Sequence, residues 1–533
     1  MVEVTRHNFD AFLPQIEYSI NSADFIAVDT EFTGLYFDET SKPSLFDNTA
    51  ERYAKIKTSV QKFTLSQIGF TTFTGNVEEN SYSAQTFQFH LCPEPSGSID
   101  QRFTVQASCI KFLCKHSFNY NKWLYEGLPY LNLAQEKLIK EELAAGLMLE
   151  SDIYEKDVQT LCSKVASWLA SAEIGECLTL SLNNDVDLSS YVYHSNLRSR
   201  FAQIWTTTNQ FDQIVVERID EMKRQLLEKQ SADSDQVFQK MQIEEMLGFT
   251  RVFRLIQEAK KPLVGHNLLM DLMFMYEKFH NYLPDSFNVF KEDIQRMFPV
   301  IFDTKHINHC LRKVLESVEV YSVSSLKDLY DGIKSILVHR TLGHPSIIQD
   351  ESVENKETDQ LHHAGYDSYL CGYVFLRLCH FLHFRDVCSM DVRPCAFKDY
   401  LGTMKKYKNC INLIRAMAAH IKLDGEEPPS QRPPLIFVNT VKPGAKLISQ
   451  QLAVWFSLYG LVDIQMINSR QAIVATSNFL TAREILEAFK NHHSIAVTKY
   501  RFWEHSRLGQ SILWVSLAVT TGSCAYLLFN TFR

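Results

Sequence analysis

The stretch DFIAVDTEF, residues 24–32, decides the fold, because an apolar run ends there in two acidic residues. The apolar part predicts a buried strand. Two later segments, 63–73 (FTLSQIGFTTF) and 86–91 (TFQFHL), are β-branched and aromatic with near-alternating polarity, which predicts two more strands. Helical patterning follows over 133–149, where Glu and Lys are interspersed with Leu. We therefore expect an α/β domain that begins with this sheet.

Asp29 and Glu31 stand two positions apart on the first predicted strand, so both side chains point to one face of the sheet. Two neighbouring carboxylates repel each other unless a cation lies between them. A metal site explains both acids, whereas a solvated strand end is the common alternative. Two later segments favour the metal site.

Each of these later segments places an acid at the start of a predicted helix. The segment 265–271 (GHNLLMD) puts Asp271 on a first helical turn, where the helix dipole alone would also favour an acid. The segment 362–367 (HHAGYD) opens another helix, and its His362 precedes Asp367 by five positions. A surface His pair is the alternative interpretation of this last segment.

Four acids and one His from three separate segments suit phosphodiester hydrolysis. Two Mg²⁺ ions about 3.5 to 4 Å apart need several carboxylate oxygens, one ion to activate water and the other to stabilise the leaving 3′ oxygen. We predict that Asp29, Glu31, Asp271 and Asp367 bind these ions. His362 is the predicted general base, because a neutral imidazole can take the proton of the attacking water.

The segments that carry these residues resemble a known family. AVDTEFTGL, GHNLLMDLM and HHAGYDSYL are similar to the three motifs of the DEDD exonucleases, in the subclass with His in the last motif. Most of the chain, including FPVIFDTK (298–305), resembles the poly(A)-specific ribonuclease family. The resemblance implies an RNase H-like nuclease domain, a mixed sheet flanked by helices. It also implies a Mg²⁺-dependent 3′-to-5′ exoribonuclease that releases 5′-mononucleotides from the 3′ end of single-stranded RNA.

The nuclease domain is expected in two parts, 1–150 and 246–423, with a helical insertion at 151–245 between them. In the family that the chain resembles, this insertion carries an Arg-x-x-x-His signature that marks a nucleic-acid-binding domain. No such signature occurs in the insertion here. Independent nucleic-acid binding by the insertion is therefore not expected.

A second domain follows the Pro-rich boundary at 424–434 (DGEEPPSQRPP). The order strand, helix, strand, strand, helix, strand over 434–505 predicts an α+β domain like the RNA-recognition motif. Its third strand, 471–476 (QAIVAT), carries no ring on which a base could stack. Pairing into a homodimer or scaffolding therefore stays open beside RNA binding.

The C-terminal segment 511–529 (SILWVSLAVTTGSCAYLLF) carries no charged residue and would span about 28 Å as a helix. It predicts a transmembrane tail anchor that leaves the catalytic domain in the cytosol, and a buried core helix is the alternative. The N-terminus has no secretory signal. The 12 Cys include no Cys-x-x-Cys pair, so reduced cysteines rather than a zinc site are expected.

A tail anchor combined with a degenerate RNA-recognition-like domain resembles the family members that trim the 3′ ends of PIWI-interacting RNA precursors. That resemblance implies a Tudor-domain adaptor and a PIWI protein as partners, at the endoplasmic reticulum or the outer mitochondrial membrane. A deadenylase of messenger RNA is one alternative. A non-catalytic membrane-anchored scaffold that binds RNA or a partner is another.

The net charge limits how such a protein can bind RNA. The 533 residues include 54 Lys and Arg against 62 Asp and Glu, a net charge of −8, which excludes a protein that coats nucleic acid through bulk positive charge. Contacts to substrate must be local. Phe32 and Leu35 could stack or pack on a terminal base, and Lys305 could reach a phosphate. Ordinary core or surface roles are equally good interpretations of these three residues.

Overall fold

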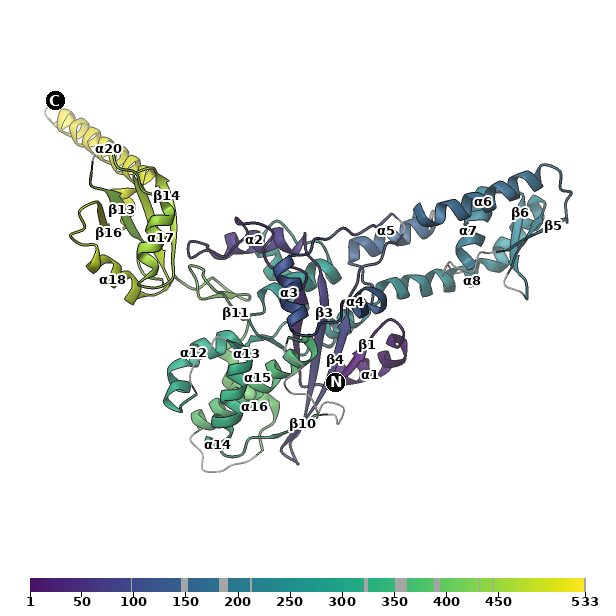
Figure 1. Cartoon of the computed structure of the whole chain (residues 1–533), viewed down its shortest axis with the longest axis horizontal. Coiled ribbons are helices and arrows are strands. Elements are labelled where there is room, and N and C mark those ends of the chain that lie inside the picture. Colours follow the sequence, from purple (N-terminus) through teal and green to yellow (C-terminus); the bar gives the residue numbers. More distant parts are fainter. Residues whose placement is uncertain are drawn as a thin grey trace. The chain divides into compact units, whose positions relative to one another are not determined.

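The computed structural model describes residues 1–533 except 97, 145–151, 182–189, 211–212, 321–324, 350–361, 388–393, 431, 443 and 532–533. The chain forms two compact units, which are described separately (Figure 1). The first unit contains Met1–Phe37 and Ile56–Ile411, and the second contains Asp38–Lys55 and Asn412–Arg533. The predicted boundary between residues 150 and 151 lies outside the described residues.

A mixed sheet of seven strands forms the centre of the first unit. Its strands follow the order β1-β4-β3-β2-β8-β9, and β10 also pairs with β4. The β2–β3 and β3–β4 pairs are antiparallel, whereas β8 is parallel to both β2 and β9. The predicted mixed sheet is thus present. The strands are β1 (Val2–Val4), β2 (Phe25–Phe32), β3 (Leu65–Asn76), β4 (Ser81–His90), β8 (Leu263–Gly265), β9 (Ile301–Asp303) and β10 (Ser346–Gln349).

Helices accompany this sheet along the chain. The helix α2 (Thr49–Val60) contains the boundary between the two units. The others are α1 (Phe9–Ser22), α3 (Ala107–Lys115), α4 (Tyr120–Glu126), α5 (Leu133–Ala144), α9 (Phe249–Ala259), α10 (Leu269–Met275), η1 (Tyr276–His280), α11 (Phe287–Met297), α12 (Thr304–Ser317), α13 (Leu326–Gly332), η2 (Ile333–Leu337), α14 (Val338–Arg340), α15 (Ala364–Val387), α16 (Phe397–Met404) and η4 (Lys405–Tyr407).

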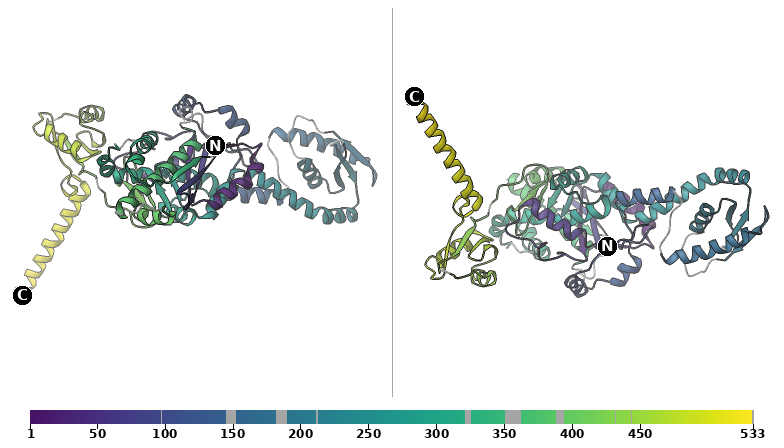
Figure 2. Two further views of the ribbon diagram at one scale, coloured as in Figure 1. Left: turned by 90° about the horizontal axis from the view of Figure 1, so that it is seen from below. Right: turned by 90° about the horizontal axis from the view of Figure 1, so that it is seen from above.

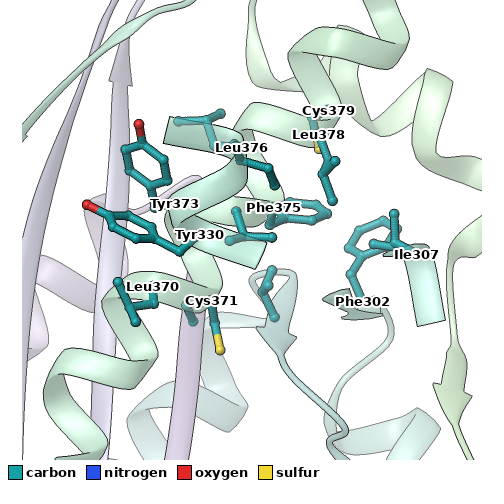
Figure 3. Packing of buried hydrophobic residues seen from close by; sticks show 14 of the residues in the cluster. Phe302, Ile307, Tyr330, Leu370, Cys371, Tyr373, Phe375, Leu376, Leu378 and Cys379 are labelled. Atoms are coloured by element: carbon teal, nitrogen blue, oxygen red, sulfur yellow. The ribbon is translucent and has the colours of Figure 1, made fainter. Parts of the chain in front are cut away.

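The helix α15 packs across β2, β3, β4 and β8 and organises the core of the first unit. It is apolar on nearly every side, as expected for a helix that is covered by sheet on one face and by other helices elsewhere. Figure 3 shows its middle turns, including Phe375 and Leu376, among buried side chains such as Phe302 and Ile307. This packing holds the N-terminal turn of α15, which carries Asp367, against the sheet.

Two glycines permit this close approach. A Cβ at Gly69 on β3 would lie 2.2 Å from the carbonyl carbon of Ala364 and the nitrogen of Gly365, at the start of α15. A Cβ at Gly372 would lie 2.1 Å from the ring of Phe73. The backbone of α15 therefore rests directly on β3 because the side chains that would separate them are missing.

The insertion contains a small sheet of its own, so the prediction of a helical insertion was wrong in part. Its three antiparallel strands follow the order β5-β7-β6 and share a core with α6 and α7, which Figure 2 shows in two views. The strands have only four or five residues each, and such short runs hardly stand out in a polar segment. The elements are α6 (Asp152–Leu169), β5 (Cys177–Leu180), α7 (Ser190–Arg200), β6 (Ile204–Thr208), β7 (Ile214–Arg218) and α8 (Glu221–Leu247).

The second unit contains a four-stranded antiparallel sheet in the order β14-β15-β13-β16. Strands and helices alternate along the chain in the predicted order, and Val438, Leu452 and Phe456 lie in the core between them. A short hairpin of β11 (Cys410–Asn412) and β12 (His420–Lys422) precedes this sheet. The elements are β13 (Ile436–Thr440), α17 (Ser449–Ser457), β14 (Val462–Asn468), β15 (Gln471–Thr476), α18 (Phe479–Ala488), β16 (Ile495–Lys499), α19 (Phe502–His505) and α20 (Arg507–Thr531).

The segment Asp38–Lys55 belongs to this second unit because Asp463 on β14 binds it. The Asp463 carboxylate accepts a hydrogen bond of 2.6 Å from the Leu45 amide and also pairs with Arg415. Within the segment, the buried Arg52 and Asp47 form an ion pair of 3.0 Å. The chain therefore visits the second unit between β2 and β3.

The prediction of a transmembrane tail over 511–529 was wrong, and with it the tail-anchored location at the endoplasmic reticulum or mitochondrial membrane. Among the described residues, no helix combines the length and the apolar character that crossing a membrane requires. The helix α20 covers this segment, and hydroxyl side chains dilute its apolar residues. Ser516, Thr520 and Ser523 each donate a hydrogen bond to a carbonyl of the same helix.

We expect Gly69→Ala to lower the free energy of unfolding by about 1–3 kcal/mol, because the added methyl meets backbone atoms of α15 that cannot turn aside. Gly402→Ala in α16 is the matched control. A Cβ there has no neighbour within 4 Å, so the change should be neutral or slightly stabilising. Chemical denaturation of both variants measures the difference. Equal stability of the two would contradict the close packing of α15 on β3.

Candidate active site

Asp29 and Glu31 lie on β2 opposite Gly69 and Gln67 of β3. Because Gly69 carries no side chain, the first turn of α15 can lie above this part of the sheet. The side-chain oxygen of Gln67 accepts a hydrogen bond of 2.8 Å from the Ala364 amide, which is the first residue of that helix. The sheet thus fixes the start of α15 beside the two acids.

Asp271 is placed by a turn between β8 and α10. The amides of Asn267 and Leu268 donate hydrogen bonds of 2.9 and 3.1 Å to the carboxylate of Asp303, a fully buried residue at the end of β9. Asn267 adopts a left-handed backbone with φ of 63°. Asp271 follows in the first turn of α10, and the hydroxyl of Thr30 donates a hydrogen bond to its carboxylate. Asp271 is thereby tied to the strand that carries Asp29 and Glu31.

His362 and Asp367 complete the group. The Nδ1 atom of His362 lies 4.0 Å from Oδ2 of Asp367, and the potential ligand atoms of Glu31, His362 and Asp367 all lie within 4.8 Å of one another. His362 precedes α15 with a left-handed backbone, φ 64°, which sets the direction of its ring. The structure therefore brings together all five residues that the sequence predicted.

The four carboxylates are strained electrostatically. Burial, together with repulsion from Asp367, Asp271 and Glu31, raises the pKa of Asp29 well above its ordinary value. Burial and the neighbouring acids likewise raise the pKa of Glu31. The pKa of Asp271 and that of Asp367 rise to about 7, in both cases chiefly through burial. Within the described part of the chain, no Lys or Arg forms an ion pair with any of the four.

Such a set of oxygen ligands fits divalent cations. Buried carboxylates without a cationic partner are costly, and a bound metal ion removes that cost by supplying the missing positive charge. Hard ions such as Mg²⁺ prefer oxygen ligands of this type. The donor set is therefore the one that the sequence analysis led us to expect for a metal centre.

The imidazole of His362 has a different environment. Burial, with His116 and His363 nearby, lowers its pKa, which favours the neutral ring. The rings of His116 and Phe112 contact the His362 ring with centroid distances of 4.1 and 4.7 Å. His363 lies instead near Glu3 and His90. His362 is thus the member of the pair that can act at the acids.

Sequence reasoning missed His116 and Phe112, which lie at the end of α3. They are 246 and 250 positions away from His362 along the chain, and a lone His or Phe on a helix gives no signal of a site. Gln67 was missed for a related reason, since its role depends on which helix end lies above it. Only the folded chain shows these three neighbours.

The three predicted substrate residues have unequal surroundings. Phe32 is half-buried and stacks on Phe274 with a centroid distance of 4.5 Å, so one face of its ring is used in packing. Leu35 is exposed and hence open to a ligand. Lys305 lies in the first turn of α12, where burial lowers its pKa and Asp303 partly offsets that effect. Of the three, Leu35 has the side chain most accessible to a base.

A protein-family model described as CAF1 family ribonuclease matches residues 4–375. The chain belongs to this family. The CAF1 family match explains the mixed sheet as the RNase H-like fold of a nuclease and confirms the predicted family resemblance and enzyme class, a 3′-to-5′ exoribonuclease.

Curated relatives match the chain over nearly its whole length. The poly(A)-specific ribonuclease PNLDC1 of Mus musculus is 34% identical over 98% of this chain and 98% of its own length. The pre-piRNA 3′-exonuclease trimmer of Bombyx mori is 32% identical over 100% of this chain and 99% of its own. The poly(A)-specific ribonuclease PARN of Xenopus laevis is 28% identical over 89% of this chain and 77% of its own.

The raised carboxyl pKa values predict how the metal-free protein responds to pH. The folded state holds protons on Asp271 and Asp367 up to about pH 7, whereas the unfolded chain releases them near pH 4. The folded state therefore binds more protons between these values, so its stability should fall as pH rises from about 5 to about 8 in EDTA. Thermal unfolding across this range measures the effect.

The double variant Asp271→Asn, Asp367→Asn separates these two groups from all others that titrate. Its stability should decline less with rising pH than that of the wild type. Added Mg²⁺ should stabilise the wild type more at pH 8 than at pH 5, because protons and cations compete for the same oxygens. An identical pH dependence in variant and wild type would show that the two carboxyl groups are not perturbed.

Proposed function

We propose that this protein is a divalent-metal-dependent 3′-to-5′ exoribonuclease that trims the 3′ ends of PIWI-interacting RNA precursors and releases 5′-mononucleotides. The observation that carries the chemistry is the group of four buried carboxylates beside one imidazole, without a cationic side chain paired to them in the described part of the chain. The choice of substrate is supported by the relative from Bombyx mori, which is named a pre-piRNA trimmer and aligns from end to end.

In this proposal Asp29, Glu31, Asp271 and Asp367 hold two Mg²⁺ ions. When bound, such ions supply positive charge that activates water and stabilises the leaving 3′ oxygen. The Thr30 hydroxyl keeps the Asp271 carboxylate turned toward the strand. The turn fixed by Asp303 and the hydrogen bond from Ala364 to Gln67 set the positions of the second and third acidic segments.

His362 accepts the proton of the attacking water. Its lowered pKa keeps the ring neutral near pH 7, so it has a free nitrogen lone pair. The contacts from His116 and Phe112 restrict the ring, which is otherwise 41% exposed. Phe32, Leu35 and Lys305 are proposed to contact the terminal nucleotides of a single-stranded RNA.

The partners belong to the same proposal. A net charge of −8 gives the chain little general attraction for RNA, so a protein that already holds the substrate would help. A PIWI protein bound to the 5′ part of the precursor, with a Tudor-domain adaptor, fits this need. The sheet of the second unit, interpreted as an RNA-recognition-like domain without stacking rings, is proposed to pair with another copy rather than to bind RNA.

A poly(A) deadenylase is the second candidate, because several relatives are named poly(A)-specific ribonucleases. Poly(A) and mixed-sequence RNA of equal length, at one Mg²⁺ concentration, distinguish the two. Similar rates on both, with faster shortening of a precursor held by a PIWI protein, support trimming. A strong preference for poly(A) that the PIWI protein does not change would identify a deadenylase. A preparation with no EDTA-sensitive nuclease activity would leave only the scaffold alternative.

Asp29→Asn should lower kcat by about a thousandfold or more, because loss of a metal ligand removes several kcal/mol of transition-state stabilisation. The shape of the side chain is kept, so the fold should be retained. Asp285→Asn is the matched control, since this carboxylate is exposed and pairs only with Lys57 in the printed ion pairs of the first unit. Nuclease rates and circular dichroism provide the test. Activity of Asp29→Asn near that of the control would remove Asp29 from the site.

His362→Ala should lower kcat by about 10² to 10⁴, the usual contribution of a general base. His116→Ala should have a smaller effect that falls on kcat rather than KM, because His116 contacts only the ring that takes the proton. The control is His363→Ala, whose ring lies near Glu3 and His90. If His363→Ala were as damaging as His362→Ala, the assignment of the base would be wrong.

A further inference from the structure

A second group of metal-binding side chains lies in the first unit outside the acidic site. His306 and Cys310 are four positions apart on α12, so both point to the same side of that helix. Cys410, the first residue of β11, comes to the same place from about 100 positions further along the chain. The ligand atoms of His306 and Cys410 lie within 4.8 Å of each other.

The spacing of the atoms matches tetrahedral coordination. The Nε2 atom of His306 lies 3.6 Å from Sγ of Cys310. A zinc ion with a nitrogen at about 2.0 Å and a sulfur at about 2.3 Å holds these two atoms about 3.6 Å apart when the angle between them is tetrahedral. The observed separation is therefore one edge of a zinc tetrahedron.

The surroundings also suit such an ion. His306 and Cys410 are both only 4% exposed, while Cys310 is exposed and leaves a way in for the ion. The hairpin partner of β11 is β12, which begins at His420 and supplies another imidazole of the type that zinc binds. Nitrogen and sulfur ligands favour Zn²⁺ and disfavour Mg²⁺, so this group is distinct in chemistry from the carboxylates.

We propose that α12 and the β11–β12 hairpin are joined by a structural zinc ion that His306, Cys310 and Cys410 bind, with His420 as the fourth ligand. The ion would fix the first two turns of α12. That helix begins directly after Asp303, whose carboxylate accepts hydrogen bonds from the amides of Asn267 and Leu268. The zinc ion would therefore stabilise the turn that leads to Asp271 without touching the substrate.

The test begins with the zinc content of the full-length protein, purified without added metal. We expect about one zinc ion per chain, and about one again in Asp29→Asn, because the two sites use different ligands. Cys310→Ser should lose most of this zinc. Cys114→Ser, which changes another exposed cysteine on α3, should keep it. Loss of the zinc in Asp29→Asn but not in Cys310→Ser would place the ion at the acidic site and overturn the proposal.

Cobalt provides a spectroscopic test that does not depend on nuclease activity. Co²⁺ added to the zinc-free protein should give the absorption bands of tetrahedral coordination with thiolate ligands, and Cys310→Ser should weaken the thiolate band. Cys410→Ser removes a buried ligand and is informative only if circular dichroism shows that it folds, which is why Cys310→Ser is the primary variant. Wild-type protein that contains no zinc and gives no thiolate band with Co²⁺ would refute the site.

Discussion

The repulsion among four buried carboxylates is the constraint on which the rest of the first unit depends. No folded chain gathers Asp29, Glu31, Asp271 and Asp367 without a free-energy cost, as their raised pKa values show. The cost must be balanced by packing elsewhere. The large apolar cluster around α15 is the principal source of that balance, because it holds the last acid in place from below.

Each acidic segment has its own restraint, and none of these restraints comes from the acids themselves. Gln67 binds the start of α15, Asp303 binds the turn before α10, and Thr30 binds the Asp271 carboxylate. The restraints come from β2, β3 and β9, which are adjacent or nearly adjacent strands of one sheet. A site assembled in this way keeps its shape when cations leave, since the scaffold does not rely on them.

The sequence was sufficient where the chemistry required unusual residues in a fixed local pattern. Asp29 with Glu31 on one strand and His362 with Asp367 at one helix start could be recognised from spacing alone. Features that depend on distant neighbours could not. His116 gains its meaning only beside His362, Gly69 only beneath Ala364, and Cys410 only beside α12. The three short strands of the insertion and the diluted hydropathy of α20 were misjudged because local pattern is weakest in short or mixed segments.

The position of Asp38–Lys55 in the second unit has a consequence for biosynthesis. Leu45 and its partner Asp463 are separated by 418 positions, so at 5 to 20 residues per second the ribosome needs roughly 20 to 80 seconds to supply the second after the first. During that interval the segment after β2 has no partner, while the strands on both sides of it are already available to pair. The early part of the chain must therefore wait, partly folded, for its last quarter, and this waiting period is when a chaperone would be of most use.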